Sequence, residues 1–369
     1  MIREIYIDNF RCLTNFRVQP GDFQLWLGDN GSGKTSVLNA LRCVQRLMRG
    51  EHVEDIFNRN SLTTWDTRRD QTIGLSLTID GEPYAYEVTI EYAEQTGKQR
   101  IKREELLWKD SSFFLFEGQE AHLHRIDRKT GRVEAGVVFP ADWSRSVIPT
   151  VAKRDDNKPL IRFREELDKI LLIHPIPLVV KDAAVSESRF LSEHAENFAQ
   201  WYRHLLQEQP SIGYAAKRHL EDVLPGFGQL SLRESGESRK LMATFRIEGK
   251  DRDFDFMNIS DGQRQLIVLY TILEALRAGV FSTVLIDEPD NFVSMREIQP
   301  WLDNLHDICD EHGRQALIIS HHPEVVNKMA RGTEFWFSRH AGAHVVVRPF
   351  PVVENMPPAE VMARGWENE

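Results

Sequence analysis

The sequence has little cysteine and no long apolar run. Only three cysteines, Cys12, Cys43 and Cys309, occur among 369 residues, and none belongs to a C-x-x-C pair. This spacing argues against both a disulfide framework and a cysteine-ligated zinc site. No apolar run approaches the length of a bilayer span, and the first residues are charged rather than typical of a signal peptide. We therefore expect a cytoplasmic protein with no membrane partner.

Positive charge is also in short supply. Lys and Arg number 46 against 56 Asp and Glu, which gives a net charge of -10. Such a surface repels nucleic acid as a whole, so DNA or RNA binding would need a local basic groove. Runs of charge this small are more often solvated faces. The candidate stripe consists of Lys98, Arg100, Lys102, Arg103, Arg125, Arg128 and Lys129.

One glycine-rich segment carries a strong functional signal. Residues 28–35 read GDNGSGKT, which matches the phosphate-binding pattern G-x-x-x-x-G-K-[ST]. A strand-like run precedes the segment and apolar residues at helical spacing follow it, as the motif requires. We expect this loop to bind ATP or GTP, with Lys34 on the β and γ oxygens and Thr35 on Mg²⁺. The candidate nucleotide-binding residues here are Gly28, Asp29, Asn30, Gly31, Ser32, Gly33, Lys34, Thr35 and Ser36.

A second motif pairs two carboxylates with a buried strand. Residues 283–289 read TVLIDEP, in which an uncharged run ends in Asp287 and Glu288. A buried parallel strand delivers acids to a sheet edge in this way. This is typical of a Walker B motif, in which Asp287 ligates Mg²⁺ and Glu288 polarises the attacking water. Alone, the pattern would also fit an acidic turn.

Two further loops contain candidate phosphate-binding residues: one precedes a predicted helix and the other follows a predicted strand. Ser260 and Gly262 precede an apolar helical pattern, which fits either a helix N-cap or a second phosphate-binding loop. His321 follows the buried strand that begins at Ala316, where it would donate to the γ-phosphate or, alternatively, cap the helix starting at Pro323. We place His321 beside Lys34 and Glu288 as a candidate catalytic residue.

In their order along the chain, these motifs resemble those of the AAA_21-type predicted ATPases, a group similar to the RecF, SMC and OLD ATPases. The resemblance rests on residues 7–11 (IDNFR), the GDNGSGKT loop, residues 259–264 (ISDGQR), residues 285–291 (LIDEPDN) and residues 319–324 (ISHHPE). It implies an ABC-type head that binds ATP and Mg²⁺, adds Arg11 to the nucleotide site, and implies a homodimer in which Ser260 and Gly262 of one subunit close over the other's ATP.

Some positions depart from the pattern of that family. Asp290 and Ser294 stand where an acidic residue and a histidine are commoner, which bears on the contact between subunits. The glutamine of the Q-loop has no clear position, Gln71 being the one candidate. No acidic Toprim-like nuclease module follows residues 319–337.

The expected fold is α/β: a P-loop NTPase with an ABC-type head, an antiparallel β lobe on a parallel core sheet and a small helical lid. Residues 1–155 would form the N-terminal lobe, 156–226 a helical insertion and 227–369 the C-terminal lobe, the two lobes making one ATPase domain. An aromatic stripe from Phe198 to Leu206 should be lid core.

We expect an ATPase that dimerises around ATP and drives a separate effector protein in a bacterial defence or DNA repair complex. The step to a biological role rests on fold-level analogy. Two alternatives stay open: a non-catalytic ATP sensor that scaffolds a partner, and a DNA-binding clamp. A sensor would release phosphate negligibly in the steady state, which distinguishes it from an enzyme. Salt-dependent DNA binding would indicate the clamp.

Overall fold

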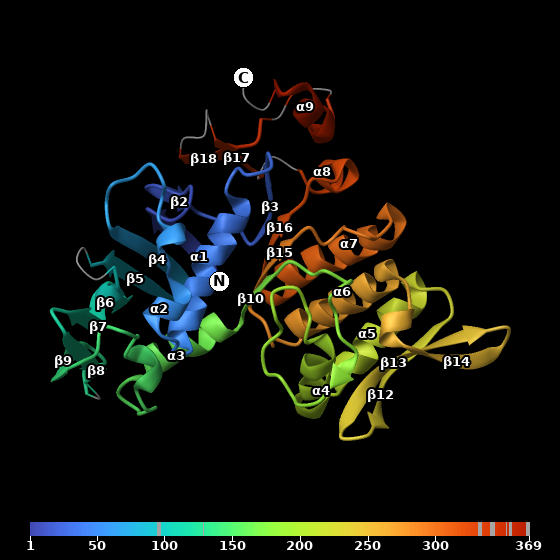
Figure 1. Cartoon of the computed structure of the whole chain (residues 1–369), viewed down its shortest axis with the longest axis horizontal. Coiled ribbons are helices and arrows are strands. Elements are labelled where there is room, and N and C mark those ends of the chain that lie inside the picture. The colour runs from blue at the N-terminus through green and yellow to red at the C-terminus, as the bar shows by residue number, and fades with distance from the viewer. Residues whose placement is uncertain are drawn as a thin grey trace. The chain divides into compact units, whose positions relative to one another are not determined.

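The computed structural model describes residues 1–93, 97–127, 129–330, 334–339, 344–351, 353 and 356–366. The chain forms two compact units (Figure 1). Unit 1 consists of Met1–Gly21, Trp26–Ile170 and Phe335–Phe350, and unit 2 consists of Asp22–Leu25, Leu171–Glu334 and Pro351–Glu369. The division into an N-terminal lobe, lid and C-terminal lobe stays a prediction.

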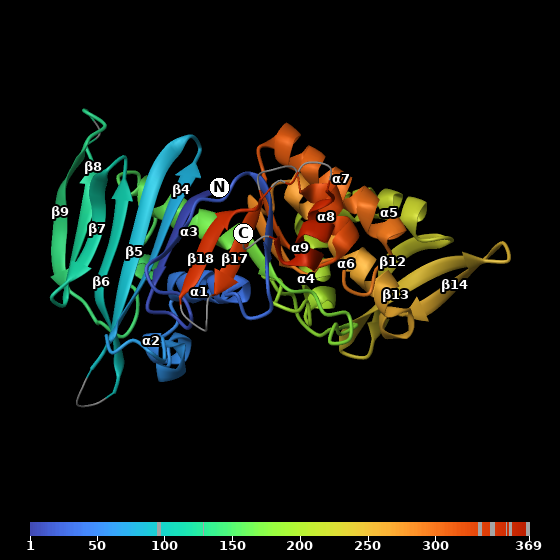
Figure 2. The same cartoon turned by 90° about the horizontal axis from the view of Figure 1, so that it is seen from above.

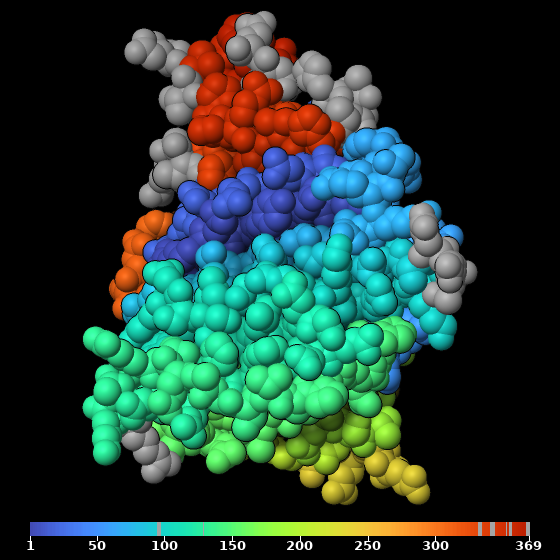
Figure 3. Space-filling view, turned by 90° about the vertical axis from the view of Figure 1, so that its left-hand side faces the viewer, coloured from blue at the N-terminus to red at the C-terminus, as the bar shows by residue number. Residues whose placement is uncertain are grey.

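Unit 1 is built on an eight-stranded antiparallel sheet with the order β2-β1-β4-β5-β6-β7-β8-β9. Alternating apolar residues face its core. The same alternation on both sides of Asp80 and Gly81 predicts a hairpin there, and the structure confirms it, because Ile79 pairs with Glu82. In the space-filling view of the side that lies at the left in Figure 1, the outer strands of this sheet, coloured teal and green, form much of the surface (Figure 3). The strands are β1 (Ile2–Asp8), β2 (Phe16–Val18), β4 (Asp70–Ile79), β5 (Glu82–Tyr92), β6 (Gln99–Trp108), β7 (Ser111–Glu117), β8 (Glu120–Ile126) and β9 (Val133–Pro140).

Helices cover one face of this sheet. The long helix α1 (Lys34–Met48) and α3 (Lys158–Asp168) both contact β4 (Figure 1). The apolar residues predicted at helical spacing in α1 are all buried, so burial of this face fixes the helix that follows the glycine-rich loop. Short helical turns complete the connections: α2 (Val53–Ile56), η1 (Arg59–Ser61) and η2 (Ile148–Thr150).

A second sheet has six strands in the order β10-β15-β16-β3-β17-β18. β15 pairs in parallel with β16, β3 pairs in parallel with β17, and β18 is antiparallel to β17. Four of these strands are almost wholly buried, which explains why they read as continuous apolar runs. The bounds are β3 (Phe23–Gly28), β10 (Ile170–Ile173), β15 (Thr283–Asp287), β16 (Gln315–Ile319), β17 (Phe335–Arg339) and β18 (Val345–Pro349).

Unit 2 packs its helices around α6 (Asp261–Arg277), whose residues 264–276 are all buried. The predicted aromatic stripe lies on α4 (Phe198–Glu208) and is mostly buried, with Phe198 stacked on Tyr202. The other helices are α5 (Ser211–Val223), α7 (Met295–His312), α8 (Pro323–Met329), α9 (Pro358–Arg364) and the turn η3 (Phe256–Asn258).

A small antiparallel sheet lies beside α5 in the same unit (Figure 2). It contains β11 (Ala183–Ala184), β12 (Phe227–Ser235), β13 (Ser238–Ile247) and β14 (Lys250–Asp255). The segment 156–226, expected to be helical, is helical only in part, because β10 and β11 interrupt it. The apolar run of β10 is too short for periodicity to separate a strand from a helix.

No helix among the described residues is both long and apolar enough to span a membrane.

Candidate functional site

The glycine-rich loop has a backbone that only glycine adopts without strain. Gly28, Gly31 and Gly33 have φ values of 144°, 79° and 102°. A Cβ added to Gly28 would lie 2.2 Å from the carbonyl oxygen of Phe337. Nothing lies within 4 Å of a Cβ built on Gly31, so the loop surface is open there. The three glycines therefore let the backbone curl tightly at the start of α1.

Lys34 turns back into this loop. Its side chain is 6% exposed, and its Nζ donates to the carbonyl oxygen of Gly28 at 2.6 Å, that of Asp29 at 3.1 Å and Ser32 Oγ at 3.1 Å. These contacts hold the ammonium inside the loop, where it and the backbone N–H groups at the start of α1 would face a phosphate together. The donor set therefore fits a phosphate group.

The remaining predicted residues of the loop that have polar side chains are exposed or half-buried. Asp29, Asn30 and Thr35 are exposed, and Ser36 is half-buried with its Oγ 3.7 Å from Cys12 Sγ. Thr35 stands in the first turn of α1, where a hydroxyl is accessible to a bound ion.

Arg11 belongs to the same unit as the loop. Its backbone has φ 54° and its N–H donates to the carbonyl oxygen of Ser61 at 2.7 Å. Its side chain is exposed, with the guanidinium 5.7 Å from the ring of Phe10. The backbone hydrogen bond of Arg11 stabilises the turn. Its guanidinium group does not take part in that bond and lies at the surface.

Unit 2 carries the acidic motif at the carboxyl end of β15. Asp287 is the last residue of the strand and is 5% exposed. Glu288 follows with φ 51°, a strained conformation for a non-glycine residue that is common at functional sites. Its N–H donates to the carbonyl oxygen of Ile319, and its Oε2 accepts from Asn291 Nδ2 at 2.7 Å. These two contacts fix the backbone and the carboxylate of Glu288.

His174 is a neighbour of this motif that the sequence interpretation missed. It follows β10, and its Nδ1 lies 3.6 Å from Asp287 Oδ2. The interaction with Asp287 raises the pKa of His174 above its ordinary value, although burial opposes the rise. Its main chain is fixed on both sides, since its N–H donates to the carbonyl oxygen of Glu193 and its own carbonyl oxygen lies 2.9 Å from His194 Nδ1.

The loop before α6 is a complete helix cap. Ser260 Oγ accepts from the N–H of Gln263, while the Gln263 side chain accepts from the N–H of Ser260. Ser260 is nevertheless exposed. A Cβ added to Gly262 would lie 2.7 Å from the carbonyl oxygen of Phe292, so this position requires glycine. The capping interpretation is confirmed, and it leaves the serine at the surface.

His321 lies just after β16 and is half-buried. The alternative in which His321 caps the next helix is wrong, because His322 does so: its Nδ1 accepts from the N–H of Glu324 at 3.3 Å.

The two unusual positions after Glu288 have structural partners. Ser294 is the N-cap of α7, and its N–H and its Oγ both donate to Glu297 Oε2. Burial raises the pKa of Asp290, and a hydrogen bond from Ser320 opposes that rise.

Gln71 does not offer its amide to a ligand. It is fully buried, its Nε2 donates to the carbonyl oxygens of Asn9 and Ser61, and its Oε1 accepts from Tyr92 at 2.8 Å. The guess that it is the Q-loop glutamine therefore has no support in its surroundings, because every polar atom of its amide already has a partner in the core of unit 1.

The candidate basic stripe is neutralised by nearby acids. Five of its cations lie within 4 Å of a carboxylate, and Arg128 lies outside the described residues. A phosphate backbone would have to displace these acids, which weakens any electrostatic attraction. The pairs are Lys98–Glu54, Arg100–Glu91, Lys102–Asp70, Arg103–Glu105 and Arg125–Glu134.

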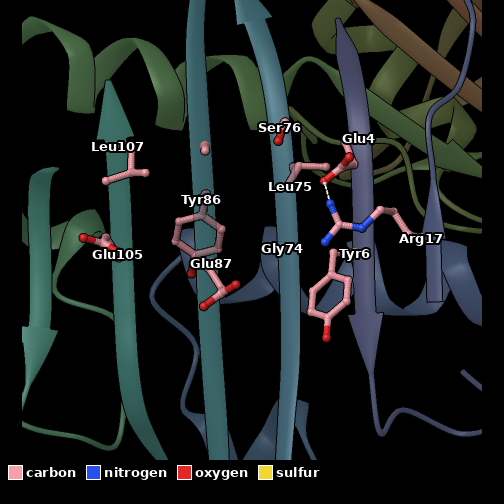
Figure 4. A pocket seen from close by; sticks show the side chains of 11 residues that line it. Glu4, Tyr6, Arg17, Gly74, Leu75, Ser76, Tyr86, Glu87, Glu105 and Leu107 are labelled. Atoms are coloured by element: carbon pink, nitrogen blue, oxygen red, sulfur yellow. Dashed lines mark hydrogen bonds and ion pairs between the residues drawn. The ribbon is translucent and has the colours of Figure 1, made fainter. Parts of the chain in front are cut away.

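A hollow of about 440 Å³ lies on the same sheet (Figure 4). Arg17 is paired with Glu4 at 2.6 Å at one side of it, and Glu87 and Glu105 also line it. Carboxylates therefore outnumber cations there, which does not suit a nucleic-acid backbone.

No group of three or more His, Cys, Asp or Glu side chains gathers to hold a metal ion in the described part of the chain. Mg²⁺ at a nucleotide does not need one, since it commonly takes one or two protein oxygens, water and phosphate oxygens. The hydroxyl of Thr35 and the carboxylate of Asp287 are ligands of that type.

Two protein families match the chain. Residues 1–209 match the family described as AAA ATPase domain, and residues 140–327 match the family described as "AAA domain, putative AbiEii toxin, Type IV TA system". No curated protein matches significantly.

Solved structures with a similar fold include heads of SMC proteins. One, an SmcHead bound to the C-winged helix domain of ScpA, has a TM-score of 0.54 and 13% identity over 94% of this chain and 97% of that one. Another, from Pyrococcus furiosus, is an Smc head domain with an extended coiled coil bound to the C-terminal domain of ScpA. It has a TM-score of 0.52 and 12% identity over 100% of this chain and 98% of that one. The fold is that of a P-loop NTPase with an ABC-type head, as predicted.

Proposed function

The chain belongs to the AAA ATPase domain family, and on this premise we propose that it hydrolyses ATP in a Mg²⁺-dependent reaction. The observation that carries the proposal is the glycine-rich loop, in which Gly28, Gly31 and Gly33 have positive φ values and Lys34 turns its ammonium back onto the loop. A nucleoside triphosphate supplies the anion that this arrangement favours.

Each candidate residue has a chemical task in this reaction. Lys34 stabilises negative charge on the β and γ phosphate oxygens. Glu288 accepts a proton from the attacking water, and its left-handed backbone and its bond from Asn291 fix its direction. His321 donates to the γ-phosphate. Mg²⁺, held by Thr35 and Asp287, would neutralise phosphate charge.

Glu288→Gln tests the catalytic part of this proposal. The amide cannot accept the proton, so we expect the phosphate release rate to fall by about 100-fold or more, whereas ATP binding stays near that of the wild type. Glu311→Gln is a matched control, because Glu311 is an exposed carboxylate of the same unit. Unchanged turnover in Glu288→Gln would remove the residue from the reaction, and negligible turnover in the wild type would favour an ATP sensor.

We also propose a homodimer closed by ATP, in which Ser260 and Gly262 of one subunit face the nucleotide bound by the other. Support comes from the exposure of Ser260 at the N-terminus of α6, where the helix dipole favours phosphate. Light scattering on Glu288→Gln should show the mass double when Mg²⁺ and ATP are added. Adding Ser260→Arg should abolish the doubling, and a monomer under all conditions would contradict the dimer.

The partner is proposed to be a separate effector protein of a defence or repair complex. Support comes from the second matching family, which is described as a putative toxin of a type IV TA system, and from the two SMC heads, each of which is bound to a domain of ScpA. Co-expression with the products of adjacent genes should yield a stable complex whose formation depends on ATP. DNA-dependent stimulation without any protein partner would instead favour a clamp.

A further inference from the structure

An arginine and a tryptophan stand beside the glycine-rich loop in unit 1. Arg339, the last residue of β17, lies with its guanidinium 5.3 Å from the ring centre of Trp65. Its Nη1 also donates to the carbonyl oxygen of Gly31 at 3.4 Å. Arg339 therefore connects an aromatic ring directly to the predicted phosphate cradle.

Trp65 is unusually exposed for its residue type. About half of its surface, 48%, is accessible, and it stands in a turn after η1 rather than in a strand or helix. Tryptophan is the largest apolar side chain, and most residues of its kind are highly buried. The arginine occupies one side of the ring, so the exposed area is consistent with a flat surface open to a second planar group.

We propose that Trp65 and Arg339 form a platform against which the base of the bound nucleotide stacks. This rests on the proposed function, since the P-loop holds the phosphates and the base lies only a ribose away from them. Every nucleobase has a flat aromatic face, and stacking on an aromatic side chain combined with a nearby guanidinium is a recurrent way of holding one.

The chain contains a matched pair for comparison. In unit 2, Arg364 lies 5.1 Å from the ring centre of Trp366. That pair has the same chemistry but no hydrogen bond to the glycine-rich loop. An effect found only at Trp65 is then specific to its place beside Gly31 rather than to any Arg–Trp pair.

Calorimetry with two probes tests the platform. Wild type, Trp65→Ala, Trp65→Phe and Trp366→Ala are each titrated with Mg-ATP and with Mg-tripolyphosphate, which has phosphates but no base. We expect Trp65→Ala to weaken ATP binding about 10-fold and to leave tripolyphosphate binding unchanged. Trp65→Phe keeps most of the affinity for ATP, and Trp366→Ala keeps all of it.

Other outcomes overturn the platform. Equal weakening of both probes in Trp65→Ala would assign Trp65 a structural role, and unchanged ATP affinity would show that the base does not touch it. If the wild type binds tripolyphosphate as tightly as ATP, the phosphate site stands and the base platform fails. If the wild type binds neither probe, the proposed function fails together with the platform.

Discussion

Lys34 and Asp287 are both buried charges, yet their partners come from very different places. Three oxygens that accept hydrogen bonds from Lys34 belong to residues within six positions of it. One partner of Asp287, His174, is far away in the sequence and comes from the end of another strand. A site formed by local contacts can be predicted from a short sequence motif. A site formed by strand pairing depends on the fold of the whole unit, so a short motif does not predict it.

Gly28→Ala changes the site that is formed by local contacts, and of the substitutions considered it should have the largest effect on stability and binding. The added Cβ would meet the Phe337 carbonyl in a backbone with φ 144°. We expect the free energy of unfolding to fall by about 4 kcal/mol and ATP binding to be lost. Chemical denaturation and calorimetry measure both. Gly21→Ala is the control, because nothing lies within 4 Å of a Cβ there, and a fully stable Gly28→Ala would contradict the account.

Glu104 extends the comparison to a buried charge that has no cation. It is fully buried, its Oε1 accepts from Tyr86 and Ser146, and burial raises its pKa to about 7. Because the folded pKa lies above the ordinary value of 4.5, folded protein binds more protons than unfolded protein between these values. The stability contributed by this group is therefore lost as pH rises from about 4.5 to 7.

Glu104→Gln should remove that pH dependence. We expect the variant to be more stable than the wild type at pH 8 by up to about 3 kcal/mol, with the difference shrinking toward pH 5. Urea denaturation at several pH values measures it. A difference that stays constant with pH would show that Glu104 does not titrate in this range.

His174→Ala changes the site that is formed by residues distant in the sequence, and of the substitutions considered it should have the smallest effect. Without the histidine, the carboxylate of Asp287 loses an orienting partner, so we expect the Mg²⁺ affinity of the ATP complex to fall about 10-fold. Mg²⁺ titrations of ATP binding measure this directly. His174→Asn should recover part of the loss, because the amide can still donate to Asp287.

His219→Ala is the control for that experiment. His219 lies 3.2 Å from the buried Glu274, so it is another histidine beside a carboxylate in unit 2. Unchanged Mg²⁺ affinity in His174→Ala, or an equal loss in His219→Ala, would rule out a specific positioning role for His174.

Sequence reasoning succeeded where the information is local. The strand before Gly28, helix α1 and the hairpin at Asp80 follow from patterns a few residues long. It failed where distant segments meet: β10 was read as part of a helical segment, and nothing around His174 marks it as a neighbour of Asp287. The surroundings of Gln71 were out of reach for the same reason, since its partners Asn9 and Tyr92 are joined to it by strand pairing and tertiary packing.

Binding of Mg-ATP, compared between the wild type and Lys34→Ala, tests the central claim most directly. Calorimetry should show saturable heat for the wild type. In Lys34→Ala, which keeps the glycine backbone but lacks the buried ammonium, we expect no measurable binding. A wild type that releases no heat with Mg-ATP, or a Lys34→Ala variant that binds as tightly as the wild type, would contradict it.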